Sequence, residues 1–150
     1  MPVFVADEQA EAPVDVERLR RLAQFVLADQ RVPETMELSV LCIDRASIAA
    51  LNSHHMGKAT PTDVLAFPID MPGETSPGEP TILGDVVLCP AVAAEQARAH
   101  GTTAERETEM LTVHGILHLL GHDHAETRER ERMFGLTDSL LAGFRDADAS

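Results

Sequence analysis

Residues 114–124 have the sequence HGILHLLGHDH, which holds four of the seven histidines of this 150-residue chain. The apolar spacing of residues 103–120 predicts that the first part of this segment is helical. His114 and His118 are four residues apart, so their side chains project from one face of that helix. Two imidazoles at this spacing suit one tetrahedral metal ion.

Gly121 follows His118 by three residues, where a helix commonly ends in a left-handed residue. A reversal of the chain there brings His124 back toward the same ion. Three neutral imidazoles leave a fourth coordination position for water, as in a catalytic zinc site. We therefore predict that His114, His118 and His124 bind one Zn²⁺ ion, since three histidines so spaced are unlike a lone core histidine.

The spacing also matches the metzincin protease pattern H-E-x-x-H-x-x-G-x-x-H, with one departure. Gly115 stands where those proteases carry the glutamate that acts as general base. Zinc lowers the pKa of water to about 7, so a hydrolase with this site does not need that glutamate. The sequence thus predicts the metal geometry without the peptidase chemistry.

The rest of the chain alternates β-rich runs with amphipathic segments, which indicates a mixed α+β domain. We expect strands near 3–5, 37–43, 62–68 and 82–89, and helices that start after Pro13, Asp44, Pro90, Thr103 and His124. The prediction is a single domain with a mixed sheet of about four strands, about five helices packed on it, and a metal cleft on the helix with the HxxxH motif. Residues 1–142 form this metal-dependent hydrolase domain, and residues 143–150 are expected to be a disordered tail.

The composition limits the partners. With 25 acidic and 12 basic residues the net charge is −13, which excludes tight, sequence-independent binding of nucleic acid over the whole surface. A local cationic cleft remains compatible with this charge. Arg18, Arg20 and Arg21 share one face of the first helix, and we interpret that face as solvated in preference to an RNA contact.

Cys42 and Cys89 lie in apolar runs, as expected of buried free thiols in a reducing compartment. No apolar stretch reaches the length of a membrane span, and the N-terminus turns acidic too early for a signal peptide. A cytoplasmic protein with no membrane partner follows.

Three blocks of the sequence together resemble the YbeY endoribonucleases, metal-dependent proteins of bacterial ribosomal RNA maturation. The blocks are HGILHLLGHDH (114–124), PTDVLAFP (61–68) and LGDVVLCP (83–90), and the resemblance extends from about residue 38 to residue 134. It implies that His114, His118 and His124 are zinc ligands in a cleft. It also implies cleavage of single-stranded RNA, with roles in 16S rRNA 3′-end maturation and ribosome quality control, and partners in ribosomal RNA, the small ribosomal subunit and a ribosome-associated protein.

Two positions depart from the family pattern. His122 stands where the family usually has tyrosine, and Met56 stands where many members carry an arginine thought to contact phosphate. Methionine cannot hydrogen-bond to phosphate, and Lys58 offers only a point charge nearby. Met56 therefore indicates either a subfamily of these enzymes or a lower activity than that of the members with arginine.

Several roles stay open at the level of sequence, and no general base is assigned. Asp63 and Asp85 are either groups that reach the cleft or structural carboxylates bonded to backbone amides. His122 is either a neighbour of the metal site or a surface residue, and Asp123 either orients an imidazole or caps the last helix. Two alternative functions are a non-catalytic ribosome-assembly factor with a structural zinc and a metallopeptidase-like hydrolase.

Overall fold

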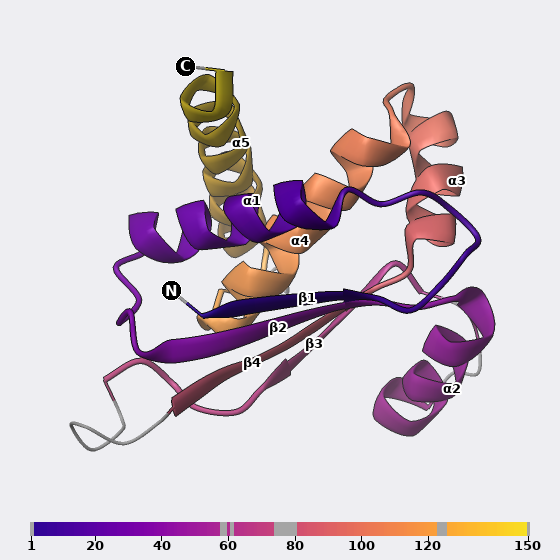
Figure 1. Ribbon diagram of the computed structural model, residues 1–150, viewed down its shortest axis with the longest axis horizontal. Coiled ribbons are helices and arrows are strands. Elements are labelled where there is room, and N and C mark those ends of the chain that lie inside the picture. Colours follow the sequence, from indigo (N-terminus) through magenta and orange to yellow (C-terminus); the bar gives the residue numbers. More distant parts are fainter. Residues whose placement is uncertain (1, 58–59, 61, 74–80, 123–125, 150) are drawn as a thin grey trace.

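A computed structural model describes residues 2–57, 60, 62–73, 81–122 and 126–149, and only the backbone of residues 55 and 56. These residues form one domain with four strands and five helices (Figure 1). The strands are β1 (Val3–Asp7), β2 (Met36–Cys42), β3 (Val64–Pro68) and β4 (Thr81–Leu88). The helices are α1 (Val16–Asp29), α2 (Arg45–Met56), α3 (Pro90–His100), α4 (Ala104–Leu119) and α5 (Thr127–Ala149). The predicted α+β fold is confirmed.

The sheet is mixed, with strand order β1-β2-β4-β3. β1 pairs with β2 and β2 with β4 in parallel, whereas β3 runs antiparallel to β4 at the edge. A register shift opposite the Glu37–Leu38 step places Gly84, at φ +154°, against β3. A Cβ atom at Gly84 would lie 2.4 Å from the backbone oxygen of Phe67, so only glycine allows this pairing.

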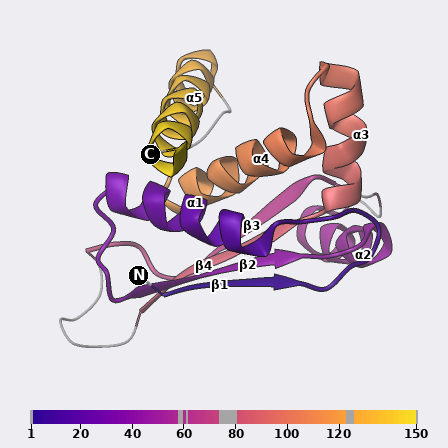
Figure 2. The same cartoon turned by 45° about the horizontal axis from the view of Figure 1, so that its top comes forward.

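Helices cover the two faces of the sheet unequally, and the views in Figures 1 and 2 agree on this. The main core lies between one face and α1, α4 and α5, where Leu38, Val86 and Ile116 are fully buried. A smaller cluster around Ile48 of α2 covers one end of the other face. Polar caps set the helix starts, since Asp15, Asp44 and Thr103 each accept a hydrogen bond from a first-turn amide of their helices.

The C-terminal residues correct one expectation. Residues 143–149 are not a disordered tail but continue α5. Phe144 is buried against the edge of the Phe25 ring, with ring centroids 5.9 Å apart. Asp148 pairs with Arg18 and Arg21 of α1 at 2.8 and 3.1 Å. The tail is ordered because α1 supplies both an apolar and an ionic partner, which hydrophobic spacing within the tail does not reveal.

The two cysteines are buried free thiols, as predicted. Burial, and to a lesser extent the nearby carboxylate of Asp7, raises the pKa of Cys42 to about 12. Burial also raises the pKa of Cys89. Among the described helices, none is long and apolar enough for a bilayer span.

Candidate functional site

The two histidines of the HxxxH motif lie near the C-terminal end of α4. The helix ends as expected at Gly121, whose φ of +94° is left-handed. Its amide donates to the carbonyl of His118, and the amide of His122 donates to that of Leu117, both at 3.0 Å. This pair of bonds is a Schellman motif. It fixes the last turn of α4, and therefore the position of His118.

His114 and His118 line one cavity of about 940 Å³. Its walls come from α4, from β3, from the end of α2 and from the second and third turns of α5. The Nε2 atom of His114 is buried from solvent. The two histidines thus lie in the wall of one cavity, as their helical spacing leads us to expect.

Helix α5 supplies two further wall residues, Phe134 and Arg130. The Phe134 ring lies 5.0 Å from the His114 ring, centroid to centroid, with 59° between their planes. The Arg130 guanidinium lies over the Phe134 ring, 5.5 Å from its centroid. Sequence analysis missed both residues, because their spacing in α5 gives no sign of which helix they face.

Asp63 lines the same cavity from the start of β3. One carboxylate oxygen accepts from the backbone amide of Val64 at 2.8 Å, and the other accepts from Nε2 of Gln96 in α3 at 3.2 Å. Asp63 therefore reaches the cavity and also has a structural role, since its carboxylate joins β3 to α3. Asn52 at the end of α2 also lines the cavity, and its side-chain amide donates to the carbonyl of Thr60 at 2.9 Å.

Asp85 belongs to the opposite face of the sheet. Val86 packs against α4, and adjacent side chains of a strand point to opposite faces. Asp85 shares its face with Val87, which belongs to the smaller core cluster under α2. Of the two roles left open for Asp85, the one that reaches the cleft is therefore disfavoured, because the register of β4 directs its side chain away from α4.

Gly115 explains why the protease glutamate is absent. A Cβ atom at this position would lie 2.6 Å from Cγ1 of Val86 and 3.3 Å from Cγ2 of Val64. Helix α4 thus lies directly on β3 and β4, and position 115 faces the sheet. A glutamate there would have to displace the sheet before it could act as a base, which disfavours the metallopeptidase alternative.

The chemistry of the described donors fits a divalent metal ion, since two imidazoles line one cavity and Nε2 of His114 is buried. Over the described residues, no group of three His, Cys, Asp or Glu side chains is close enough to hold a metal ion. The third predicted ligand, His124, lies outside the described residues, as do Asp123, Lys58 and the side chain of Met56. His122 is half-buried in a separate hollow beside Glu129, so it is not a wall of the His114 cavity.

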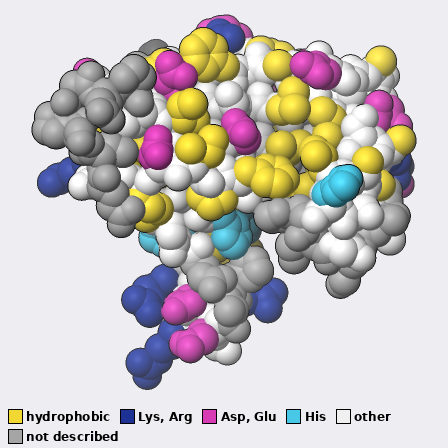
Figure 3. All heavy atoms as spheres, turned by 90° about the horizontal axis from the view of Figure 1, so that it is seen from below, with side chains coloured by type: hydrophobic (Ala, Val, Ile, Leu, Met, Phe, Trp, Pro, Cys, Tyr) yellow, Lys and Arg dark blue, Asp and Glu magenta, His cyan; other side chains and the backbone are white. Residues whose placement is uncertain are grey.

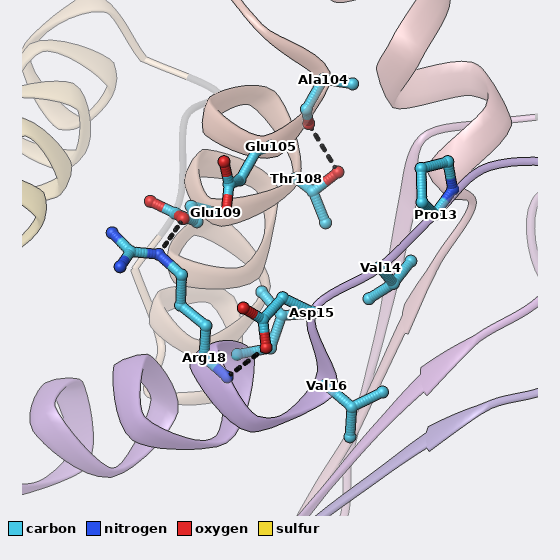
Figure 4. A pocket seen from close by; sticks show the side chains of 10 residues that line it. Pro13, Val14, Asp15, Val16, Arg18, Ala104, Glu105, Thr108 and Glu109 are labelled. Atoms are coloured by element: carbon cyan, nitrogen blue, oxygen red, sulfur yellow. Dashed lines mark hydrogen bonds and ion pairs between the residues drawn. The ribbon is translucent and has the colours of Figure 1, made fainter.

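A second cavity, of about 710 Å³, lies between the first turns of α1 and α4 (Figure 4). Glu109 of α4, with 3% of its side chain exposed, accepts from Nε of Arg18 at 2.7 Å and pairs with Arg145 of α5 at 3.4 Å. The prediction of a solvated arginine face is corrected for Arg18, which binds carboxylates of α4 and α5, whereas Arg21 pairs with Asp148 but stays exposed. This network fixes the position of α5 relative to the helix that carries the histidines.

Comparison with known proteins shows the family and the fold of the chain. A family model described as Endoribonuclease YbeY matches residues 4–145. A protein named Endoribonuclease YbeY from a Nocardioides species is 52% identical, over 97% of this chain and 99% of its own. Its namesake in Thermobifida fusca is 50% identical, over 97% and 95% of the two chains. The solution structure of TM1509 from Thermotoga maritima shares the fold, with a TM-score of 0.62 and 23% identity over 97% of this chain and 93% of that one.

Proposed function

The chain belongs to the YbeY endoribonuclease family and is an RNA-cleaving hydrolase, and we propose that it cuts single-stranded RNA during maturation of the 16S rRNA 3′ end. We further propose that it acts in ribosome quality control and requires one Zn²⁺ ion held by His114, His118 and His124. The observation that carries the proposal is the pair of α4 imidazoles lining one cavity.

A bound Zn²⁺ ion acts as a Lewis acid, which lowers the pKa of water and offsets negative charge on a phosphodiester. The protein's own groups hold and surround it. His114 and His118 are fixed by the regular helix α4, whose end is closed by Gly121. The Phe134 ring packs on His114 and limits its rotation. We assign no general base; Asp63 is the carboxylate that lines this cavity among the described residues, and the amide of Val64 and the side chain of Gln96 each donate a hydrogen bond to it.

The net charge of −13 supports a model in which a partner brings the RNA to the protein and the cavity only cleaves it. An acidic body repels bulk RNA, so free RNA is expected to bind weakly. The small ribosomal subunit, together with a ribosome-associated protein, would then bring the substrate to the cavity. This assignment places the protein in the cytoplasm, where ribosomes mature.

The test is cleavage by purified, zinc-loaded protein of 3′-extended 16S rRNA within small subunits, alongside single-stranded and duplex RNA. His114→Ala is expected to abolish cleavage and lower the zinc content. The matched control is His54→Ala, which removes an exposed imidazole of α2 that does not line the cavity. The control should retain both activity and zinc.

Two outcomes would contradict the proposal. Equal cleavage by the His114→Ala variant and the parent would attribute the activity to a contaminating nuclease. Zinc-loaded parent protein that melts at a higher temperature yet cuts no single-stranded RNA would favour the non-catalytic assembly factor instead.

A further inference from the structure

Arg130 differs from the other arginines in its position. It is the arginine among the described residues that lines the cavity of His114 and His118. Five other arginines form ion pairs with carboxylates, namely Arg18, Arg20, Arg21, Arg45 and Arg145. Within the described part of the chain, Arg130 has no ion pair, and the residue as a whole is exposed. Its charge is therefore available to a ligand in the cavity.

The aromatic ring beneath Arg130 restricts where that charge lies. The guanidinium is 5.5 Å from the Phe134 centroid, and the Phe134 ring is 5.0 Å from His114. The order is therefore guanidinium, phenyl ring, imidazole, along the wall of one cavity. A guanidinium stacked on an aromatic face keeps its edge N–H groups available, and those groups match the oxygens of a phosphate.

The charge of the surroundings makes this cation important. Seen from below, the broad face of the molecule shows apolar and acidic side chains, whereas arginines interspersed with acidic side chains lie on a projecting part, with a histidine where that part meets the body (Figure 3). Arg128, Arg130 and Arg132 are all exposed and lie in the first two turns of α5. A polyanion near a body of net charge −13 needs a local cation at the place where it binds.

We propose that Arg130 binds a phosphate of the RNA backbone next to the scissile bond and so positions the strand over His114 and His118. This inference rests on the proposed function. Position 56 carries methionine where many family members have an arginine. Arg130 would give the cavity a phosphate contact from α5, a helix that lies outside the three sequence motifs. Arg130 acts on the backbone phosphate and not on a base, so it contributes to binding single strands of any sequence.

The test compares Arg130→Gln with Arg128→Gln in the full-length protein. Both substitutions remove one positive charge from an exposed position of the same helix, but Arg128 does not line the cavity. The first measurement is the Kd of a fluorescent single-stranded RNA for metal-free protein, by anisotropy over a series of salt concentrations. The second is KM and kcat of zinc-loaded protein on the same RNA.

For Arg130→Gln we expect Kd and KM to rise about 5- to 10-fold at low salt, with kcat within about twofold of the parent. The slope of log Kd against log salt should fall by about 0.7, the value for one phosphate contact on a single strand. Arg128→Gln should change Kd by less than twofold. Arg130→Lys should recover the salt slope but only part of the affinity, because lysine keeps the charge and loses the planar stack on Phe134. A merely structural role would not change the salt slope.

Two results would overturn the inference, and they differ from each other. If the parent binds and cuts RNA and both glutamine variants behave alike, Arg130 does not position the strand and the proposed function stands. If the parent neither binds nor cuts single-stranded RNA, the proposed function fails and the role of Arg130 fails with it. Equal melting temperatures of parent and variants would exclude unfolding as the cause of any difference.

Discussion

Replacing Gly115 with alanine is expected to push α4 away from the sheet and to move His114 and His118 with it. The added Cβ would lie 2.6 Å from Cγ1 of Val86 and 3.1 Å from Cγ2 of the same residue. Carbon atoms of different residues pack best about 3.5–4.0 Å apart, so the gap must open by about 1 Å. Val86 is fully buried and its side chain is stiff at χ1, so it has little freedom to turn away.

The free energy of unfolding reflects two opposed terms. Overpacking of a core costs about 1–3 kcal/mol, and Gly→Ala within a helix gains up to about 1 kcal/mol. The net expectation is a loss of up to about 2 kcal/mol of stability, because the helix term of about 1 kcal/mol offsets part of the overpacking cost. A displacement of about 1 Å at a catalytic group can reduce the rate about 100-fold, so RNA cleavage should fall more than stability does.

Gly135→Ala is the matched control. Gly135 lies within α5, and a Cβ atom there would meet nothing within 4 Å. It should gain the helix term alone and raise stability by up to about 1 kcal/mol. Urea unfolding of parent and both variants, followed by circular dichroism in metal-free buffer, isolates the clash as the difference between the two alanines.

A third variant tests the contact between position 115 and Val86 directly. Val86→Ala in the Gly115→Ala background vacates the space that the new methyl group needs. The two changes should therefore couple favourably, by about 0.5–3 kcal/mol in a double-mutant cycle. Additive effects, or a Gly115→Ala protein as stable as Gly135→Ala, would show that α4 is not tightly packed on β4.

Three further perturbations follow from the same structure. Gly121→Ala should destabilise by about 1–2 kcal/mol, because alanine is strained at φ +94°, and should weaken zinc binding in a metal titration. Glu109→Gln should lower stability in urea by about 1–3 kcal/mol, because it leaves Arg18 without its buried carboxylate, and an unchanged midpoint would contradict this network. Cys42 should resist a thiol-specific dye at pH 8 until the protein unfolds, since burial raises its pKa to about 12. Because that folded pKa exceeds the unfolded value, the thiol's contribution to stability should be complete below about pH 8.5 and be lost as pH rises toward 12, which unfolding midpoints across this range would measure.

Local sequence determined each element that carries the site. The i, i+4 spacing places His114 and His118 on one face of any α-helix, whatever it packs against. Gly121 ends that helix for an equally local reason, since only glycine adopts a left-handed φ without strain. The capping residues and the apolar periods likewise set the strands and helices within a few residues of their observed bounds, except at the C-terminal end of α5.

Which elements meet was decided by tertiary packing. Arg130 and Phe134 join the histidines because α5 packs against α4, and nothing in the spacing of α5 specifies that neighbour. Asp85 faces away from the cavity because of the register of β4. Arg18 ceases to be a solvated residue because Glu109 and Asp148 reach it from two distant helices.

The histidine motif therefore defines a helix with two ligands on one face, a property of the α-helical repeat alone. The cavity around that face, the cation in its wall and the contact that requires glycine at position 115 all depend on side chains distant in sequence. Such contacts arise only when the apolar faces of α4, α5 and the sheet are buried together. The hydrophobic effect favours burial of each face, but it does not select the element that covers it.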